Sequence, residues 1–170
     1  MVIAEVACGH EGVMERVDQL INAVAESESD LIKFQMFFTH ERAKEGEKEW
    51  EIFDRLTFDE GDWRKIIRKS RKAGLRILAD VYGYESFRLA ESLGVDGFKV
   101  HSEDLLNSFF IRDIATTGKV TLLGIGGSKR KELYDLLVFL SKSDHDRSIV
   151  LMPGIQTFPT PLEAHSVQEV

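Results

Sequence analysis

The sequence has little cysteine, no excess of positive charge and no long apolar run. The single cysteine, Cys8, excludes an intramolecular disulfide and fits a reducing compartment. Because Cys8 follows an apolar run, we expect a buried structural thiol and not a nucleophile. No segment is long and apolar enough to span a membrane, and the N-terminus lacks the basic and apolar blocks of a signal peptide. These absences predict a cytoplasmic protein without a membrane partner.

The charge balance argues against a general nucleic-acid-binding surface. The formal net charge is −7, whereas such a surface needs clustered Lys and Arg. One basic stretch, Arg64 to Lys72, has the spacing of a solvated helix face, and this interpretation is preferred to nucleic-acid binding. We therefore expect no nucleic-acid partner. Lysines placed at strand ends of an acidic protein point instead to local use on an anionic ligand.

Length and patterning predict one α/β domain over residues 1–170. The 170 residues are 43% hydrophobic and 30% charged, which is typical of a globular domain with a substantial core. Strand-like runs start near Val2, Asp30, Leu75, Gly97, Val120 and Ile149. Helical spacing is found at 13–24, 59–73, 85–93, 105–117 and 129–143, the last with Ser128 as the expected N-cap. Strict alternation of strand and helix predicts parallel strands with right-handed crossovers.

Two features leave the architecture open at this point. The charged insertion at 38–53 is either a solvated loop with a short helix or an element that covers a substrate. The six β-α units fit an open doubly wound sheet, or most of a barrel whose last two strands are missing. A closed eight-stranded barrel needs about 250 residues.

Polar residues within or just after three apolar runs are the main clue to function. They are Glu5, Lys33, Gln35, Lys99, His101 and Ser102. A strand buried on both faces normally reads as continuous hydrophobic sequence. Because α/β proteins keep their chemistry at the carboxyl ends of parallel strands, we expect these side chains to converge on one face.

Four motifs in order resemble the N-acetylneuraminate (sialic acid) synthase family. They are IAEVACGHEG from Ile3, DLIKFQMF from Asp30, ESLGVDGFKVHSEDLLN from Glu91 and FPTPLEA from Phe158. The resemblance implies a TIM (β/α)8 barrel, of which this chain holds the first six units, with the last two strands beyond Val170. It also implies condensation of phosphoenolpyruvate with an N-acylated hexose, a homodimer, and a divalent metal, manganese or magnesium. The metal-ligating histidines would lie outside this chain, so no metal ligand is assigned within it.

The resemblance assigns the donor side of the site. Lys33 and Lys99 would contact phosphoenolpyruvate, and Ser102 would add a hydroxyl; the alternative is that each lysine pairs with a nearby carboxylate. Gln35 belongs to the same second-strand motif and is also assigned to substrate binding. The glycine-rich turn from Gly124 is either a phosphate-binding turn or simply a tight connection.

The resemblance is weaker on the acceptor side. Glu5 would assist proton transfer, or pair with a lysine as a structural group; the two roles are compatible. Asp80, Gln156 and Phe158 are assigned to substrate binding, but they depart from the residues that better-known synthases carry there. The acceptor sugar is therefore left open. Two rival functions remain: a Schiff-base aldolase using a lysine, and a non-catalytic truncated barrel.

His10 and His101 do not have the spacing of a local metal motif. A lone histidine is more often a hydrogen-bonded structural residue. His10 matches a family histidine in the loop after the first strand, where it would shape the site, whereas His101 stands where many relatives have a small residue and its role is left open.

Overall fold

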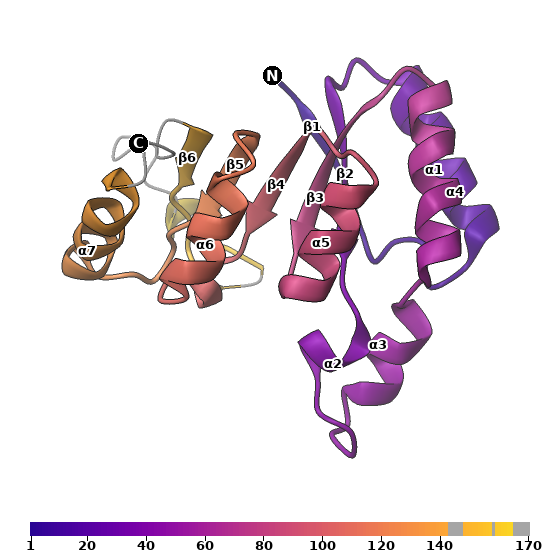
Figure 1. Cartoon of the computed structure of the whole chain (residues 1–170). Coiled ribbons are helices and arrows are strands. Elements are labelled where there is room, and N and C mark those ends of the chain that lie inside the picture. Colours follow the sequence, from indigo (N-terminus) through magenta and orange to yellow (C-terminus); the bar gives the residue numbers. More distant parts are fainter. Residues whose placement is uncertain (143–147, 158, 165–170) are drawn as a thin grey trace. The chain divides into compact units, whose positions relative to one another are not determined.

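The structure is a computed structural model that describes residues 1–142, 148–157 and 159–164 (Figure 1). The chain forms two compact units, Met1–Phe98 and Lys99–Val170. Each unit is built from strands that alternate with helices. The alternation predicted from the hydrophobic runs is therefore confirmed.

The first unit contains three parallel strands in sequence order, with the second in the middle. These are β1 (Ile3–Ala7), β2 (Leu31–Met36) and β3 (Arg76–Val81). Its helices are α1 (Met14–Glu26), α2 (Thr39–Arg42), α3 (Trp50–Leu56), α4 (Glu60–Lys72) and α5 (Tyr84–Ser92). The strand β4 (Gly97–Val100) spans the boundary between the units.

One face of these strands packs against helices and carries the apolar core. The ring of Phe34 on β2 meets Trp63 of α4 edge-on, with the centroids 6.0 Å apart. Both residues are almost fully buried. Because successive side chains of a strand point to opposite faces, Lys33 and Gln35 project from the face away from Trp63. The polar interruptions noted in the sequence therefore share one face of β2.

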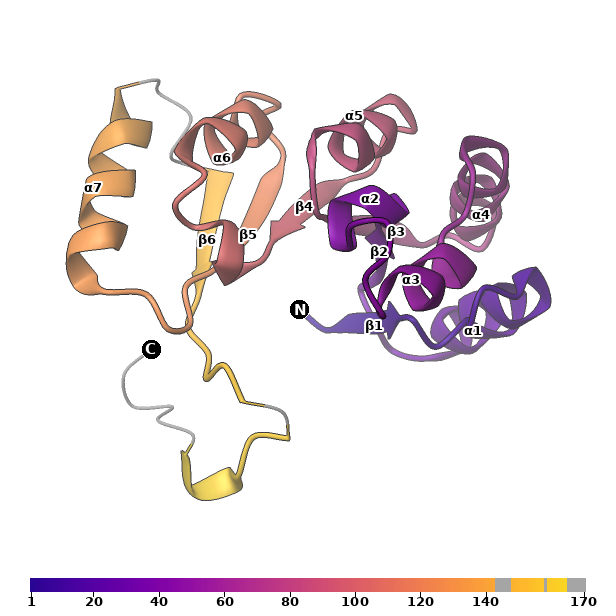
Figure 2. The ribbon, with the colours of Figure 1, turned by 90° about the horizontal axis from the view of Figure 1, so that it is seen from below.

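The insertion after β2 forms two short helices joined by a turn, where the first of the two interpretations expected a loop with one short helix. α2 begins three residues after β2 ends, and α3 follows a turn at Gly46. Both views of the ribbon place α2 and α3 beyond the carboxyl ends of the strands of this unit (Figures 1 and 2). Phe37, in the segment between β2 and α2, packs against Phe53 of α3, with the ring centroids 5.6 Å apart.

The second unit contains a parallel strand pair and two longer helices. Its strands are β5 (Val120–Gly124) and β6 (Ile149–Met152), which pair from Thr121 with Ile149 to Gly124 with Met152. The described residues of this unit include the helices α6 (Ser108–Ala115) and α7 (Arg130–Ser141) and the 3₁₀ turns η1 (Ser102–Asp104) and η3 (Leu162–Ala164).

Two predicted helix starts were wrong. The helix expected from residue 105 begins at Ser108, because the chain first makes the η1 turn and then passes Asn107 in a non-helical conformation. Ser128 was expected to cap α7, but the N-cap is Lys129. The Ser128 hydroxyl instead donates to the carbonyl oxygen of Ile125 at 2.6 Å, within the preceding turn.

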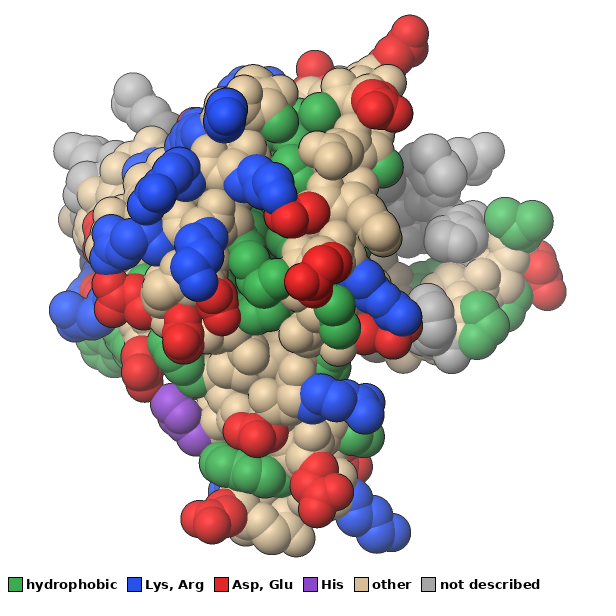
Figure 3. All heavy atoms as spheres, turned by 90° about the vertical axis from the view of Figure 1, so that its right-hand side faces the viewer, with side chains coloured by type: hydrophobic (Ala, Val, Ile, Leu, Met, Phe, Trp, Pro, Cys, Tyr) green, Lys and Arg blue, Asp and Glu red, His purple; other side chains and the backbone are tan. Residues whose placement is uncertain are grey.

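The basic stretch lies on α4 and is balanced by carboxylates. Arg64 pairs with Glu60, and Lys65 pairs with Asp62 at 2.7 Å. Lys69 reaches across to α1 and pairs with Asp18 there. The face in Figure 3 accordingly shows Lys and Arg side chains next to Asp and Glu. This pattern fits the predicted solvated helix face. In the described residues, no helix has the length and apolar character needed to cross a membrane.

The α/β class with parallel strands is confirmed. A closed eight-stranded barrel, and a single barrel domain over residues 1–170, remain predictions.

Candidate functional site

The ammonium group of Lys33 lies between two carboxylates on the helix-free face of the first unit. Its Nζ atom pairs with Glu5 and lies 3.1 Å from Oδ2 of Asp80. The side chain of Lys33 is only 7% exposed and that of Asp80 is fully buried, whereas Glu5 is 42% exposed. A buried charge is tolerated when it is paired and hydrogen-bonded, and this arrangement meets that condition. Glu5 is the member of the cluster that a ligand can reach.

Strand register explains why these three residues meet. Glu5 on β1 is the direct neighbour of Lys33 on β2, and Gln35 is the direct neighbour of Asp80 on β3. Residues that are aligned across parallel strands point to the same face, so all four side chains share it. Of the residues expected to converge, the structure brings Glu5, Lys33 and Gln35 to this face, and it adds Asp80, which was not part of that expectation. The structural alternative for Glu5, an ion pair with a lysine, is also present.

A bulge at the end of β1 fixes the orientation of Glu5. The register between β1 and β2 shifts between Glu5 and Ala7, and Ala7 has a φ of 47°. A non-glycine residue in this left-handed region is uncommon and marks a locally constrained backbone. The N–H of Ala7 donates to Oε1 of Glu5 at 2.9 Å, so one carboxylate oxygen holds the bulge and the other faces Lys33.

Cys8 extends the polar cluster toward the strand ends. Its Sγ atom donates to Oε1 of Gln35 at 3.2 Å. The predicted burial of Cys8 is only partial, because the residue follows the bulge and is partly exposed. Partial burial still raises the pKa of the Cys8 thiol, with a smaller opposing effect from Arg42 and a further increase from Glu5. A protonated thiol is a poor nucleophile, which agrees with the structural role expected for Cys8.

The α2 helix adds an anchored acidic residue that the sequence analysis did not single out. Oε1 of Glu41 accepts hydrogen bonds from the backbone N–H groups of Glu85 (3.2 Å) and Ser86 (3.1 Å) in the first turn of α5. Its other oxygen accepts from Phe38 N–H at 3.0 Å. A carboxylate at a helix N-terminus is stabilised both by these donors and by the helix dipole. A β-carbon at Gly83 would lie 2.4 Å from Oε1 of Glu41, so the contact requires glycine there or a shift of that side chain.

Beside Glu41, Arg42 is held between aromatic rings. Its guanidinium carbon lies 4.1 Å from the ring centroid of Tyr82 and 4.9 Å from that of Phe53. Tyr82 follows Asp80 by two residues at the end of β3, so Arg42 stands next to that strand end. No sequence motif indicated this arrangement, because it depends on how the insertion folds back.

His10 is a structural residue of the loop after β1. Its ring is 1% exposed, and its Nδ1 atom accepts a hydrogen bond from Gly12 N–H at 3.0 Å. The ring packs against Phe58, with the centroids 4.8 Å apart. Burial lowers the pKa of His10 and keeps the ring neutral. The expected hydrogen-bonded role is therefore what the contacts describe.

The second unit gathers the remaining predicted residues in two contacts. Lys99 Nζ lies 3.1 Å from Nε2 of His101 just after β4. The side chain of Gln156, beyond β6, donates to Oγ of Ser102 at 2.8 Å. Phe158 was also assigned to substrate binding and lies outside the described residues. The meeting of Lys99 with Lys33, which belongs to the other unit, stays a prediction.

The glycine-rich turn after β5 packs closely on the segment after β6. A β-carbon at Gly126 would lie 2.5 Å from both the carbonyl oxygen of Gly154 and Nε2 of Gln156. Ile125 N–H also donates to Met152 at 3.0 Å. Close backbone approach is thus one reason for glycine here. The contacts describe a tight connection, and phosphate binding by this turn stays a prediction.

The described residues do not fit the metal that the resemblance implies. Among residues 1–142, 148–157 and 159–164, no group of three or more His, Cys, Asp or Glu is placed to hold a metal ion. The expected ligands lie beyond Val170 and remain a prediction.

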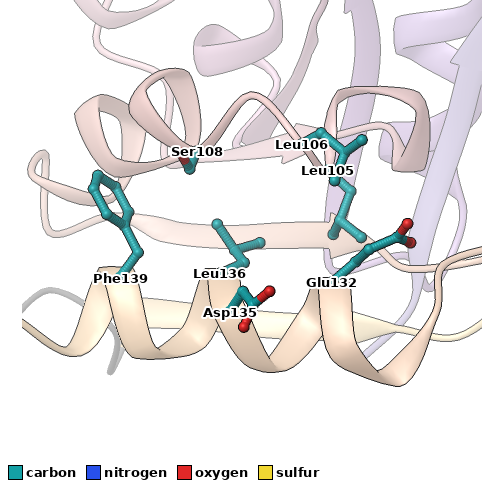
Figure 4. Close-up of a pocket in the computed structure, with 7 residues that line it drawn as sticks. All are labelled: Leu105, Leu106, Ser108, Glu132, Asp135, Leu136 and Phe139. Carbon is teal, nitrogen blue, oxygen red and sulfur yellow. The ribbon is translucent and has the colours of Figure 1, made fainter.

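A pocket in the second unit lies between α7 and the segment leading into α6 (Figure 4). Its volume is about 200 Å³, and it is lined by Leu105, Leu106, Ser108, Glu132, Asp135, Leu136 and Phe139. This lining offers two carboxylates and no cationic side chain. It contains none of the predicted site residues and does not suit an anionic substrate.

Comparisons with known proteins agree with the fold and the motifs. The sequence profile of the NeuB family matches residues 20–170. The chain is 26% identical over 176 residues to N,N'-diacetyllegionaminic acid synthase of Campylobacter jejuni, which covers 95% of this chain and 53% of that protein. It is 25% identical over 162 residues to the uncharacterized protein MJ1065 of Methanocaldococcus jannaschii, with 95% and 48% covered.

A solved structure with the same fold is the N-acetylneuraminic acid (sialic acid) synthetase of Leptospira borgpetersenii in complex with citrate. The TM-score is 0.86 at 20% identity, and the match covers 95% of this chain and 56% of that one. This chain spans about half the length of the curated relatives it matches.

Proposed function

Because the chain belongs to the NeuB family, we propose that the full-length protein condenses phosphoenolpyruvate with an N-acylated hexose. The product would be a nine-carbon 2-keto sugar acid, with release of phosphate. The observation that carries the proposal is the cluster of Lys33, Glu5 and Asp80 on the helix-free face of β1, β2 and β3. A buried lysine that is paired with two carboxylates, one of them exposed to a ligand, is typical of a preorganised polar site and not of an apolar core.

The proposed reaction forms one carbon–carbon bond and breaks one carbon–oxygen bond. The nucleophilic C3 of phosphoenolpyruvate attacks the aldehyde carbon of the open-chain hexose, and the aldehyde oxygen takes up a proton. Water adds at C2 of phosphoenolpyruvate, and the bond from C2 to the phosphate oxygen breaks. Phosphate leaves, and C2 becomes the keto carbon of the product.

In this proposal lysines balance the charge of the donor substrate. Phosphoenolpyruvate carries a carboxylate and a phosphate, so Lys33 and Lys99 would each face one of its anionic groups, with Ser102 donating a hydroxyl hydrogen bond. Lys33 already has two carboxylate neighbours, so the incoming substrate must compete with Glu5 for its ammonium group. Asp80, which is fully buried, would keep Lys33 in position.

Glu5 would move the proton. It is partly exposed, and the N–H of Ala7 fixes one of its carboxylate oxygens. When substrate takes over the ammonium of Lys33, the second oxygen is released to accept a proton from the attacking water or to return one to the aldehyde oxygen. Gln35, on the same face, would orient the substrate, and Gln156 would contact the acceptor.

The divalent metal remains part of the proposal for the full-length protein. When bound, it would polarise the acceptor aldehyde. The described residues do not hold it, and the steps assigned to this chain do not depend on it.

The ion pairs argue against a Schiff-base aldolase acting through Lys33. An ammonium group between two carboxylates has no lone pair with which to attack a carbonyl carbon. Borohydride trapping with a keto acid tests this rival directly, since a covalent adduct on Lys33 or Lys99 would favour it.

The decisive experiment is a phosphate-release assay on the full-length protein with phosphoenolpyruvate and a panel of N-acyl hexoses. We expect phosphate release that requires both substrates. Lys99→Ala should weaken phosphoenolpyruvate binding at least about tenfold without unfolding the protein, since removing a cation from a partly desolvated anion site typically costs about 2–5 kcal/mol. The proposal would be refuted if no acceptor gave phosphate release with any of the divalent metal ions added to the assay. We further propose that the protein is a cytoplasmic homodimer, and ultracentrifugation of the full-length protein would test the oligomeric state.

A further inference from the structure

We propose that Glu41 is a positioning residue for the acceptor sugar. Its carboxylate joins residues 37–38, the exit from β2, to the first turn of α5, which follows residues 82–83, the exit from β3. Glu41 belongs to α2, which lies beyond the carboxyl ends of the strands of the first unit (Figures 1 and 2). The inference rests on the proposed function, which supplies the acceptor sugar and places the donor at Lys33.

The carboxylate of Glu41 uses both of its oxygens. Oε2 accepts a hydrogen bond from the N–H of Phe38, in the exit from β2, at 3.0 Å. Oε1 accepts from the N–H groups of Glu85 and Ser86 at 3.2 and 3.1 Å. Hydrogen bonds to an ionised acceptor are roughly twice as strong as neutral ones, and Glu41 is partly buried. These bonds fix the exit from β2 against the start of α5.

The two strand exits are also in direct contact. The ring of Phe37 meets the ring of Tyr82 edge-on, with the centroids 5.8 Å apart. Oγ of Ser86 accepts hydrogen bonds from the N–H groups of Tyr82 at 3.2 Å and of Gly83 at 3.3 Å, which orders the exit from β3. An aromatic contact and the carboxylate of Glu41 therefore hold the exits from β2 and β3 together.

The strand exits stand beside the polar cluster, on the side from which a second substrate must arrive. Gln35 and Asp80 are aligned across β2 and β3, and one residue separates each of them from the exit of its strand. The side chain of Lys33 is only 7% exposed, so a donor that reaches its ammonium group lies deep in the site. The acceptor aldehyde then approaches the donor past Gln35, which is partly exposed, and past the strand exits. Strand exits that are ordered before the sugar arrives lower the entropic cost of binding it.

Gly83 gives a second way to disturb the carboxylate. A β-carbon at Gly83 would lie 2.4 Å from Oε1 of Glu41, and the three nearest atoms all belong to the Glu41 side chain. The φ and ψ of Gly83 are −173° and −176°, an extended backbone that alanine also adopts. Gly83→Ala therefore displaces the carboxylate of Glu41 without removing its charge and without straining the backbone.

The test uses the full-length protein in the phosphate-release assay. Glu41→Ala removes all three hydrogen bonds, and Glu41→Gln keeps one carbonyl oxygen but replaces the other by a nitrogen that cannot accept. The matched control is Asp96→Asn, because Asp96 is also a partly buried carboxylate that accepts a backbone N–H, that of Ile77 at 2.6 Å, but at the amino end of β3. Titration calorimetry measures binding of phosphoenolpyruvate and of each N-acyl hexose of the panel, and thermal melting measures folding.

We expect Glu41→Ala and Gly83→Ala each to raise the KM for the acceptor at least about threefold, with kcat and phosphoenolpyruvate affinity within about twofold of the wild type. Glu41→Gln should have an intermediate KM. Gly83→Ala should have no further effect in the Glu41→Ala background, because the side chain that it displaces is already absent. Asp96→Asn should leave the KM for the acceptor unchanged, whatever it does to the melting temperature.

Three results would overturn the inference. The first is a wild-type KM for the acceptor in both Glu41→Ala and Gly83→Ala. The second is an equal rise in Asp96→Asn, which would trace the effect to a general loss of stability. The third is an additive effect of the two substitutions, which would mean that Gly83→Ala does not act through Glu41. If Glu41→Ala fails to fold, Glu41→Gln and Gly83→Ala decide by the same KM.

Failure of this inference and failure of the proposed function give different results. Phosphate release with a wild-type KM for the acceptor in Glu41→Ala and Gly83→Ala would overturn only the role of Glu41. Weaker hexose binding by these two variants, without phosphate release from any acceptor by the wild type, would overturn only the proposed reaction.

Discussion

Replacing Lys33 by Met tests whether the buried ion pairs hold the first unit together. The change leaves Asp80, whose side chain is fully buried, without its ammonium neighbour. Breaking a buried pair by removing one partner typically costs about 3–5 kcal/mol, because a charge then remains in a poorly solvated place. The free energy of unfolding of a typical domain is about 5–15 kcal/mol, so this single change should remove a large part of it.

Glu5 is more exposed than Lys33, so the cost of removing its charge can be compared with the cost of removing the buried charge of Lys33. Its side chain is 42% exposed, so its pair with Lys33 is screened by water, and loss of such a pair costs about 0.2–1 kcal/mol. Glu5→Gln keeps an acceptor for the Ala7 N–H and removes only the charge. We therefore expect the loss in free energy of unfolding to be at least about three times smaller for Glu5→Gln than for Lys33→Met.

A double variant separates the charge effect from lost packing. Replacing a buried ion pair by apolar residues is often close to neutral. Lys33→Met with Asp80→Leu should therefore be more stable than Lys33→Met alone. Urea titration followed by tryptophan fluorescence measures all three variants, and an unchanged m-value shows that the transitions are comparable.

Two results would refute this reasoning. One is an equal loss in Glu5→Gln and Lys33→Met, which would mean that burial does not set the cost. The other is a double variant less stable than Lys33→Met, which would mean that Asp80 is held by interactions that do not involve its charge.

Three further predictions concern packing and pH. Gly126→Ala should destabilise the protein by about 1–3 kcal/mol, because the new methyl would lie 2.5 Å from the carbonyl oxygen of Gly154. Gly154→Ala is the control: a β-carbon there would meet nothing within 4 Å, so this variant should have the melting temperature of the wild type. Burial lowers the pKa of His10 from 6.5, so the stability it contributes is complete above about pH 6.5 and is lost as the pH falls toward the lowered value. Urea titrations should therefore show that the free energy of unfolding falls less between about pH 7.5 and pH 5.5 in His10→Gln than in the wild type. An equal fall in the two proteins would contradict this. Trp63→Ala should cost about 3–5 kcal/mol since Trp63 is 3% exposed, and Trp50→Ala, at a less buried position, should cost clearly less in the same assay.

The sequence by itself determined the α/β class and most strand positions. Hydrophobic runs bounded by turn residues are local signals, and parallel strands alternating with helices leave few other arrangements. The same signals placed Lys33 and Gln35 on one face of β2, since side-chain direction alternates strictly along a strand. The order of four motifs indicated the family, which the profile match to residues 20–170 confirms.

Tertiary structure decided which charges meet. Lys33 and Asp80 are 47 residues apart, and only the register between β2 and β3 brings them within 3.1 Å. The charged insertion after β2 was expected to be a solvated loop with a short helix or an element that covers a substrate, and neither reading predicted that Glu41 accepts backbone hydrogen bonds from α5, more than forty residues further along the chain. Ser128 likewise looked like a helix cap, but its hydroxyl found a closer acceptor at Ile125. Pairings of this kind depend on the distance between side chains in space, which local patterns in the sequence do not encode.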